Sequence, residues 1–288
     1  MLRLRFAALS MTFWKRIRPL HPLLAAALLL TATGCEKVIS LDLKTSAAQL
    51  VFEGNLADDG RPCQVSLSNS TDYSNTNTFA PVTGATVTLA DNAGNRETLR
   101  ETSPGQYVGT SVLGVAGRAY TLSVATGGAT YVALSTLPAP VVPFDKLSNQ
   151  LSPVGKDNIQ AVVDYTDPVG QGNGYLFRQY RNGRLNNTIF LQNDQFNDGK
   201  HVSQPLRTMG GNASDPNNLN KLVVGDSLVV EMQNVDTGVY EYFRTLNLIL
   251  TTNPATATTP ANPKSNFSGG VLGYFSAHSK RVRRIKVL

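Results

Sequence analysis

Side chains that could carry out catalysis are few and widely spaced in this sequence. Beyond the first 34 residues there are two histidines, His201 and His278, 77 positions apart. The chain has no His-Glu-x-x-His, Gly-x-Ser-x-Gly or phosphate-loop motif, so it lacks the common signatures of metal-dependent or nucleophilic hydrolysis. Four acids could act as general acid and base if the fold paired them: Asp164, Asp167, Asp194 and Glu231. The sequence does not indicate that any two of them meet, so we predict no catalytic residues and a protein that is not an enzyme.

Two oxygen-rich segments, residues 164–167 and 193–199, could in principle offer ligands to calcium. The second has a spacing faintly like that of a calcium loop, but no glutamate follows where a bidentate ligand is needed. We therefore interpret both segments as solvated turns. The expectation is that the protein holds no metal and no cofactor.

Cys35 is the position with the most specific chemical signature. The 34 residues before it contain five bases and no acid, and their apolar run, 23–30, is too short to span a bilayer, which needs roughly 20 residues. This is the pattern of a cleaved signal peptide. It ends in Ala32-Thr33-Gly34-Cys35, which resembles the lipobox of bacterial lipoproteins, where the cysteine thiol receives diacylglycerol. We predict cleavage between Gly34 and Cys35 and a lipid anchor on Cys35; the alternative is a buried free cysteine.

Cys63 is the second of the chain's two cysteines. If Cys35 is acylated, no disulfide can form within the chain, and stability must come from the size of the core. Strand alternation places Cys63 on the same face as Val65 and Leu67. We therefore predict that Cys63 is a buried, inert thiol.

The net charge of +6 does not describe the body of the protein. Without the leader, 21 basic residues face 20 acidic ones, and residues 36–279 contain 16 bases against 20 acids. This excludes the broad basic surface of a nucleic-acid-binding protein. Five bases gather in residues 280–288 among apolar residues, which favours an edge strand with Lys and Arg outward. Contact with acidic headgroups is the alternative for this tail.

Alternation of apolar and polar residues predicts a mainly β protein. In the first part of the chain the expected strands are 49–56, 64–68, 85–89, 106–109, 119–124 and 130–134, separated by Gly, Asn and Pro turns. Short strands at this spacing are typical of a β-sandwich. Later strands are expected at 159–165, 174–180, 188–191, 227–232 and 270–277, with an Asn-Gly hairpin at 181–184.

One segment has helical periodicity instead, and it predicts an amphipathic helix near 237–250. Asp236 can cap its beginning and Pro254 follows its end. Apolar residues at three- and four-residue spacing form its stripe, which we interpret as core: Val239, Tyr242, Phe243, Leu246, Ile249 and Leu250.

Three prolines within residues 138–143 indicate a linker. The predicted fold is therefore two β-sandwich-like domains with one amphipathic helix in the second. Its parts are a signal peptide (1–34), a lipidated tether (35–48), an immunoglobulin-like β-sandwich (49–137), the linker (138–143) and a second β-rich domain (144–288).

The order of expected strands and turns resembles that of carboxypeptidase-regulatory-like and other immunoglobulin-like modules. The segments that carry this resemblance are 81–89, 91–95, 105–107 and 117–124. That resemblance implies a non-catalytic module in which tyrosines fill core or corner positions.

The order of features along the mature chain resembles the Bacteroidota lipoproteins called domain of unknown function 4249. The pieces that carry this resemblance best are the Cys35-Glu36 start and the block Gly-Gly-Val-Leu-Gly-Tyr-Phe at 269–275. Members of that family tend to accompany TonB-dependent outer-membrane receptors.

Together these features predict a lipid-anchored envelope protein of the outer membrane. The family resemblance implies a non-catalytic accessory or binding component of a TonB-dependent transport system. Residues 71–79 and 212–220 are candidate binding loops on a rigid scaffold. The alternatives are a structural or adhesive surface lipoprotein, or a hydrolase of glycans or peptides. The expected partners are the membrane and a TonB-dependent receptor, and nucleic acid is not expected.

Overall fold

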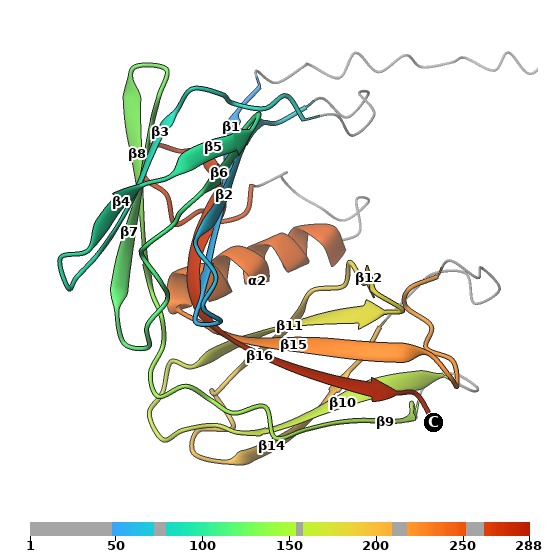
Figure 1. The fold of residues 1–288 in the computed structure, drawn as a ribbon. Helices are drawn as coiled ribbons and strands as arrows, with labels where there is room; N and C mark the ends of the chain where they lie inside the picture. Colours follow the sequence, from blue (N-terminus) through green and yellow to red (C-terminus); the bar gives the residue numbers. More distant parts are fainter. Residues whose placement is uncertain (1–47, 72–78, 154–157, 209–217, 252–261) are drawn as a thin grey trace, which may run out of the picture. The chain divides into compact units, whose positions relative to one another are not determined.

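A computed structural model of the chain describes residues 48–71, 79–153, 158–208, 218–251 and 262–288 (Figure 1). The predicted signal peptide, Gly34 and Cys35 lie outside the described residues, as do most residues of the two candidate binding loops. No helix in the described ranges is long and apolar enough to cross a membrane.

The first part of the chain is built of short strands in the order that the alternation predicted. They are β1 (Leu50–Ala57), β2 (Gln64–Asn69), β3 (Thr86–Asp91), β4 (Arg96–Thr98), β5 (Arg100–Ser103), β6 (Gln106–Val108), β7 (Ala119–Thr126) and β8 (Ala129–Thr136). Of these, β4 and β5 were not predicted, because each has three or four residues and a largely polar sequence.

The later part contains further strands and the predicted helix. They are β9 (Lys146–Leu151), β10 (Ile159–Thr166), β11 (Gly174–Arg181), β12 (Arg184–Leu185), β13 (Phe190–Asn193), β14 (His201–Leu206), β15 (Ser227–Val235), α2 (Thr237–Thr251) and β16 (Leu272–Lys286). The chain is thus mainly β with one helix in its described part, which confirms the predicted fold class.

Three sheets pack in sandwich-like layers. The largest has nine strands in the order β12-β11-β15-β16-β1-β2-β6-β5, with β13 also paired to β11. A four-stranded sheet, β4-β3-β7-β8, and a three-stranded sheet, β14-β10-β9, complete the fold. All described residues belong to one compact unit, and a domain boundary at 138–143 stays a prediction.

β16 is one continuous strand with two different sets of neighbours. Its first half pairs in parallel with β1, from Val51 opposite Leu272 to Ala57 opposite His278. Its second half pairs antiparallel with β15, from Asn234 opposite Ser279 to Ser227 opposite Lys286. The predicted strand 270–277 and the predicted basic edge strand are therefore one element.

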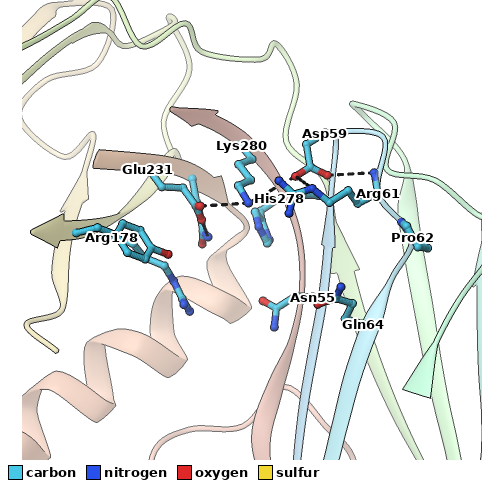
Figure 2. A pocket seen from close by; sticks show the side chains of 12 residues that line it. Asn55, Asp59, Arg61, Pro62, Gln64, Arg178, Glu231, His278 and Lys280 are labelled. Atoms are coloured by element: carbon cyan, nitrogen blue, oxygen red, sulfur yellow. Dashed lines mark hydrogen bonds and ion pairs between the residues drawn. The ribbon is translucent and has the colours of Figure 1, made fainter. Parts of the chain in front are cut away.

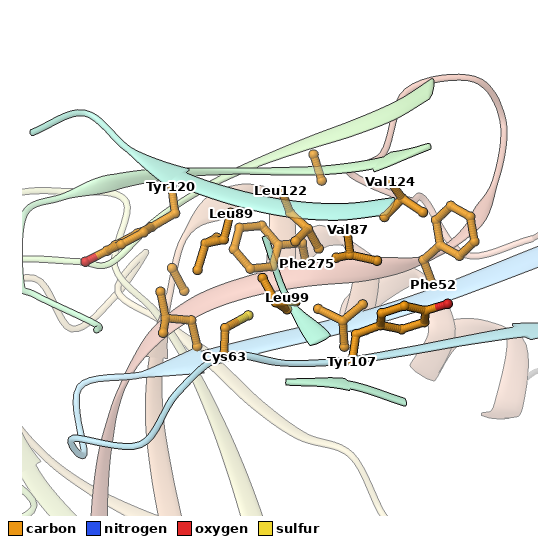
Figure 3. Packing of buried hydrophobic residues seen from close by; sticks show 14 of the residues in the cluster. Phe52, Cys63, Val87, Leu89, Leu99, Tyr107, Tyr120, Leu122, Val124 and Phe275 are labelled. Atoms are coloured by element: carbon orange, nitrogen blue, oxygen red, sulfur yellow. The ribbon is translucent and has the colours of Figure 1, made fainter. Parts of the chain in front are cut away.

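The N-terminal core lies between the nine-stranded and four-stranded sheets (Figure 3). Cys63 is fully buried there, as predicted, and burial together with the charge of Glu97 raises the pKa of its thiol to about 12. Tyr107 and Tyr120 are buried in this core, the kind of position that the module resemblance implied. Each also bonds to backbone: Tyr107 accepts from Ala85 N (3.0 Å) and Tyr120 donates to Leu113 O (2.9 Å). The core also contains Phe267, Val271, Phe275 and Ala277, which come from the far end of the chain.

A second core lies between the three-stranded sheet and the β11, β15 and C-terminal β16 portion of the large sheet. Most of its side chains are aromatic or aliphatic, and the ring centroids of Tyr165 and Tyr175 lie 4.6 Å apart. At one end of this layer the predicted Asn-Gly hairpin forms, with Asn182 at φ 50° and Gly183 at φ 79°.

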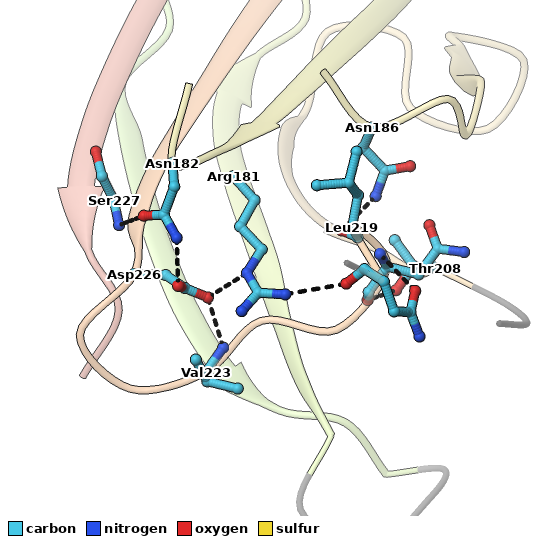
Figure 4. A network of polar contacts seen from close by, with 10 residues as sticks. Arg181, Asn182, Asn186, Thr208, Leu219, Val223, Asp226 and Ser227 are labelled. Atoms are coloured by element: carbon cyan, nitrogen blue, oxygen red, sulfur yellow. Dashed lines mark hydrogen bonds and ion pairs between the residues drawn. The ribbon is translucent and has the colours of Figure 1, made fainter. Parts of the chain in front are cut away.

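Asp226 fixes that hairpin to the start of β15 (Figure 4). Its carboxylate accepts hydrogen bonds from Arg181 Nε (2.6 Å) and Asn182 Nδ2 (2.7 Å). Burial opposes ionisation of Asp226, but the hydrogen bond from Val223 N and the contacts with Arg181 and Asn182 hold its pKa below the ordinary value. A fixed hairpin keeps β11, which carries part of the site below, in register with β15.

Helix α2 packs on one face of the nine-stranded sheet. Asp236 caps it as predicted, because Asp236 Oδ1 accepts a hydrogen bond of 2.9 Å from Val239 N. The first part of the apolar stripe is buried against Leu176, Val235 and Tyr274. Its end differs from the prediction: Ile249 and Leu250 are exposed, since the helix extends beyond the sheet surface that it covers.

Candidate functional site

A polar cleft of about 220 Å³ opens on the same face of the nine-stranded sheet that α2 partly covers (Figure 2). Side chains alternate along a strand, so β1, β2, β11, β15 and β16 each place every second residue on this face. The β1–β2 turn adds a rim. The residues that line the cleft are Asn55, Ala57, Asp59, Arg61, Pro62, Gln64, Arg178, Tyr180, Glu231, Gln233, His278 and Lys280.

Helix α2 and the cleft divide this face between them. Leu176, Val235 and Tyr274 form the apolar part under the helix, and each lies on a strand that also contributes to the cleft. On β11, Arg178 follows Leu176 by two residues and lies on the same face. On β15, Gln233 precedes Val235 by two residues and also lies on that face. The cleft is therefore the polar continuation of the surface on which α2 packs.

Lys280 joins the two carboxylates of the cleft. Its Nζ lies 3.2 Å from Glu231 Oε2 and 3.5 Å from Asp59 Oδ2. The other oxygen of Glu231 accepts a hydrogen bond of 2.5 Å from Gln233 Nε2, and Asp59 Oδ2 also lies 3.3 Å from Arg61 Nε. These contacts hold the charged side chains in fixed positions before any ligand arrives.

His278 is buried at the cleft and is neutral at pH 7. Burial lowers its pKa from 6.5 to about 4; the charges of Arg178 and Lys280 also disfavour protonation, while Glu231 favours it. Its Nδ1 lies 2.9 Å from Ser276 Oγ. Ser276 is 1% exposed and does not line the cleft, so this pair does not present a hydroxyl nucleophile to a bound molecule.

Asp167 and Asp194 come together elsewhere, at the loop before β11. The Tyr175 hydroxyl donates a hydrogen bond to Asp167 Oδ1, and burial raises the pKa of Asp167, with Asp194 adding to the effect. Asp194 Oδ2 accepts from Gly172 N (2.6 Å) and Asn173 N (2.9 Å). Asp194 thus fixes a backbone loop, Asp167 is engaged by a tyrosine hydroxyl, and these hydrogen bonds occupy oxygens that general acid–base chemistry would need.

The profile of the family described as Domain of unknown function (DUF4249) matches residues 36–284. The chain belongs to this family. No curated protein matches it. Among solved structures it is similar to a segment of two fibronectin type-III domains from chicken tenascin, with 14% sequence identity and a TM-score of 0.21. That match covers 66% of this chain and 91% of the tenascin segment.

In this DUF4249 chain the four acids considered from the sequence separate into three places. Asp167 and Asp194 form the loop clamp, Glu231 lies in the cleft, and Asp164 on β10 lies 3.8 Å from His201 Nε2 at the surface. Residues 193–199 form a mostly solvent-accessible turn, as expected, but its two acids also accept hydrogen bonds from a neighbouring loop, and Asp194 is buried. Across the described ranges, no three His, Cys, Asp or Glu side chains gather in a way that could hold a metal ion.

The cleft of this DUF4249 chain was not predicted from its sequence. A signal for it was present in strands that carry polar residues at every second position, as in Arg178 and Tyr180, or Glu231 and Gln233. Such a pattern is ordinary for a solvated sheet face. Only the order β11-β15-β16-β1-β2 brings these separate stripes into one cleft.

Proposed function

We propose that this protein is a lipid-anchored, non-catalytic binding component of the outer membrane that serves a TonB-dependent transport system. The observation that carries the binding role is the cleft, in which fixed polar side chains from five strands surround an open volume. Membership of the DUF4249 family and the leader ending at Cys35 support the envelope location.

Binding fits the cleft better than catalysis for a chemical reason. Glu231 and Lys280 are paired with each other, His278 is neutral and buried, and Ser276 is enclosed. Hydrolysis needs a nucleophile or an activated water beside a base that can take up its proton. A cleft with prearranged hydrogen-bonding groups needs only a ligand of matching shape and charge.

The position of the cleft along β1 suits a protein held by its N-terminus. The chain enters the described fold just before Leu50, whereas Asn55 and Ala57 line the cleft near the other end of the strand. Seven residue steps in a strand span about 23 Å. The cleft therefore lies away from the point where a tether from Cys35 joins the fold.

The proposal is tested in a native host envelope with full-length protein and a Cys35→Ala variant. We expect the parent protein to incorporate a lipid label and to co-purify from detergent extracts with a TonB-dependent receptor. The Cys35→Ala variant should lose the label and leave the membrane fraction, while Cys63→Ala should keep both. An unchanged label in Cys35→Ala would refute the anchor. Extracts that contain the labelled protein but no transport receptor would favour a structural surface lipoprotein.

A further inference from the structure

The charged residues of the cleft are not all neutralised by one another. Asp59 and Glu231 are the two carboxylates among the lining residues, and both are engaged by Lys280 or Arg61. Arg178 is the third cation. Within the described ranges, no carboxylate lies within 4.0 Å of its guanidinium, so the cleft has one cation in excess.

Among the described residues, the lack of a carboxylate partner for Arg178 is a consequence of side-chain direction. Arg178 stands directly opposite Glu231 in the β11–β15 pair. Glu231, however, points to Lys280 and Gln233, and the Arg178 side chain ends apart from it in the cleft (Figure 2). The guanidinium instead reaches the Tyr274 hydroxyl, which also lies 3.4 Å from Asn55 Nδ2.

A guanidinium has five N–H donors in a planar fork, and one tyrosine oxygen satisfies only part of it. Arg178 is partly buried, so water supplies less compensation than it would on an open surface. Neutral polar groups line the same cleft, namely the amides of Asn55 and Gln64 and the hydroxyl of Tyr180. This surrounding suits an acceptor of opposite charge with further polar atoms attached.

We propose that the cleft binds the carboxylate of a small polar ligand, with Arg178 as its two-pronged partner. A planar carboxylate matches the guanidinium fork, and a single negative charge balances the single excess cation. A doubly charged phosphate would meet Glu231 and Asp59 in the same small cleft. The volume of about 220 Å³ suits the free C-terminus of a short peptide or a sugar acid. This inference rests on the proposed binding function.

The test measures ligand binding on full-length protein purified in detergent, by saturation-transfer difference NMR. Glycylglycine and D-glucuronate are the carboxylate probes. Glycylglycinamide and glucose are their controls, in which an uncharged group replaces the carboxylate. We expect at least one carboxylate probe to bind, and the tighter one identifies the peptide or the sugar source. Arg178→Gln should weaken it by at least about tenfold, and Arg178→Lys should give a smaller loss.

Arg96→Gln is the matched control, because it removes the same charge from an exposed position on β4. It should leave the affinity within about twofold of the parent. The unfolding midpoints of all variants show whether the Arg178 variants remain folded. If Arg178→Gln is unfolded, a weakened affinity for the carboxylate probe in folded Arg178→Lys still supports the role of Arg178.

The inference is overturned if neither carboxylate binds the parent protein, if the uncharged probes or sulfate compete equally well, or if Arg178→Gln and Arg96→Gln behave alike. Recovery of a transport receptor from envelopes is a separate measurement. A protein that recovers the receptor but binds no carboxylate would retain the proposed function and lose this ligand.

Discussion

Ser135 Oγ donates a hydrogen bond of 2.6 Å to Asp236 Oδ2, although the two residues are 101 positions apart in the chain. Ser135 is 1% exposed and lies on β8, while Asp236 precedes α2. The same carboxylate accepts from Thr136 N (2.8 Å), and its other oxygen caps the helix through Val239 N. One side chain therefore joins the edge of the four-stranded sheet to the helix beside the cleft.

Replacing this carboxylate should destabilise the protein by more than the loss of an ordinary cap. Asp236→Ala removes the cap and leaves Ser135 and Thr136 N without their acceptor, at a combined cost of about 2 to 3 kcal/mol. Asp236→Asn keeps an acceptor and should cost less. Urea unfolding measures both, and Thr237→Ala at the exposed neighbouring position is the control. Equal stabilities for Asp236→Ala and Thr237→Ala would contradict the assigned role.

Gly273 is expected to tolerate no side chain. It has a φ of 95°, and a Cβ there would lie 1.9 Å from Phe52 O on the paired strand β1. Gly273→Ala should therefore cost about 3 kcal/mol or more, because both the backbone conformation and the strand contact must change. Gly270 has a similar φ of 74° but open space around it, so Gly270→Ala should cost about 1 kcal/mol. Thermal unfolding distinguishes the two, and similar losses would refute the close-approach explanation.

The stability of the protein should depend on pH through His278. Its pKa is about 4 in the folded chain against 6.5 as the ordinary value, so between these limits the unfolded chain binds more protons. The free energy of unfolding should then fall as pH falls from 6.5 toward 4, by up to about 3 kcal/mol. His278→Gln should remove this part of the slope, whereas His201→Gln, at a 61% exposed side chain, should keep it. Identical slopes in the parent and His278→Gln would rule out the buried neutral histidine.

The C-terminal strand should be needed by both cores. Phe275 and Ala277 are buried with the N-terminal residues, and Val287 is buried with the second core. Burial of Phe275 and of Val287 contributes roughly 1.5 to 3 kcal/mol each, which is a large share of the stability of a typical domain. A chain ending at residue 261 should lack a cooperative unfolding transition, and a synthetic peptide of residues 262–288 should restore it. A cooperative transition in the shortened chain alone would show that β16 is dispensable.

Much of the fold could be predicted because strand alternation and turn residues are local signals. The hairpin at Asn182 and the helix capped by Asp236 are examples in which a few neighbouring residues determine the structure. β9 and β14 were not predicted, since their sequences, KLSNQL and HVSQPL, lack a sustained alternation. Both segments form strands because they pair with β10, a contact that the local sequence pattern does not report.

The cleft depends on contacts that no local pattern reports. Arg178 and Lys280 are 102 positions apart, and their proximity requires that β15 lies between β11 and β16. Even the direction of Glu231 toward Lys280, and away from its register partner Arg178, is a result of side-chain packing. The residue types were visible in the sequence, but the pairing that leaves Arg178 without a carboxylate counter-ion among the described residues was not.

The parallel pairing of β1 with β16 also affects when the protein can fold. A ribosome releases a chain from its N-terminus, so β1 emerges early and its partner Leu272–Lys286 emerges after every other named strand. Until then β1 has an open edge, and the N-terminal core lacks Phe267, Val271 and Phe275. Folding should therefore be completed only after release of the whole chain. If the chain is exported unfolded, as the proposed envelope location requires, this late closure leaves it extended during transfer and exposes it to aggregation and proteases in the same interval.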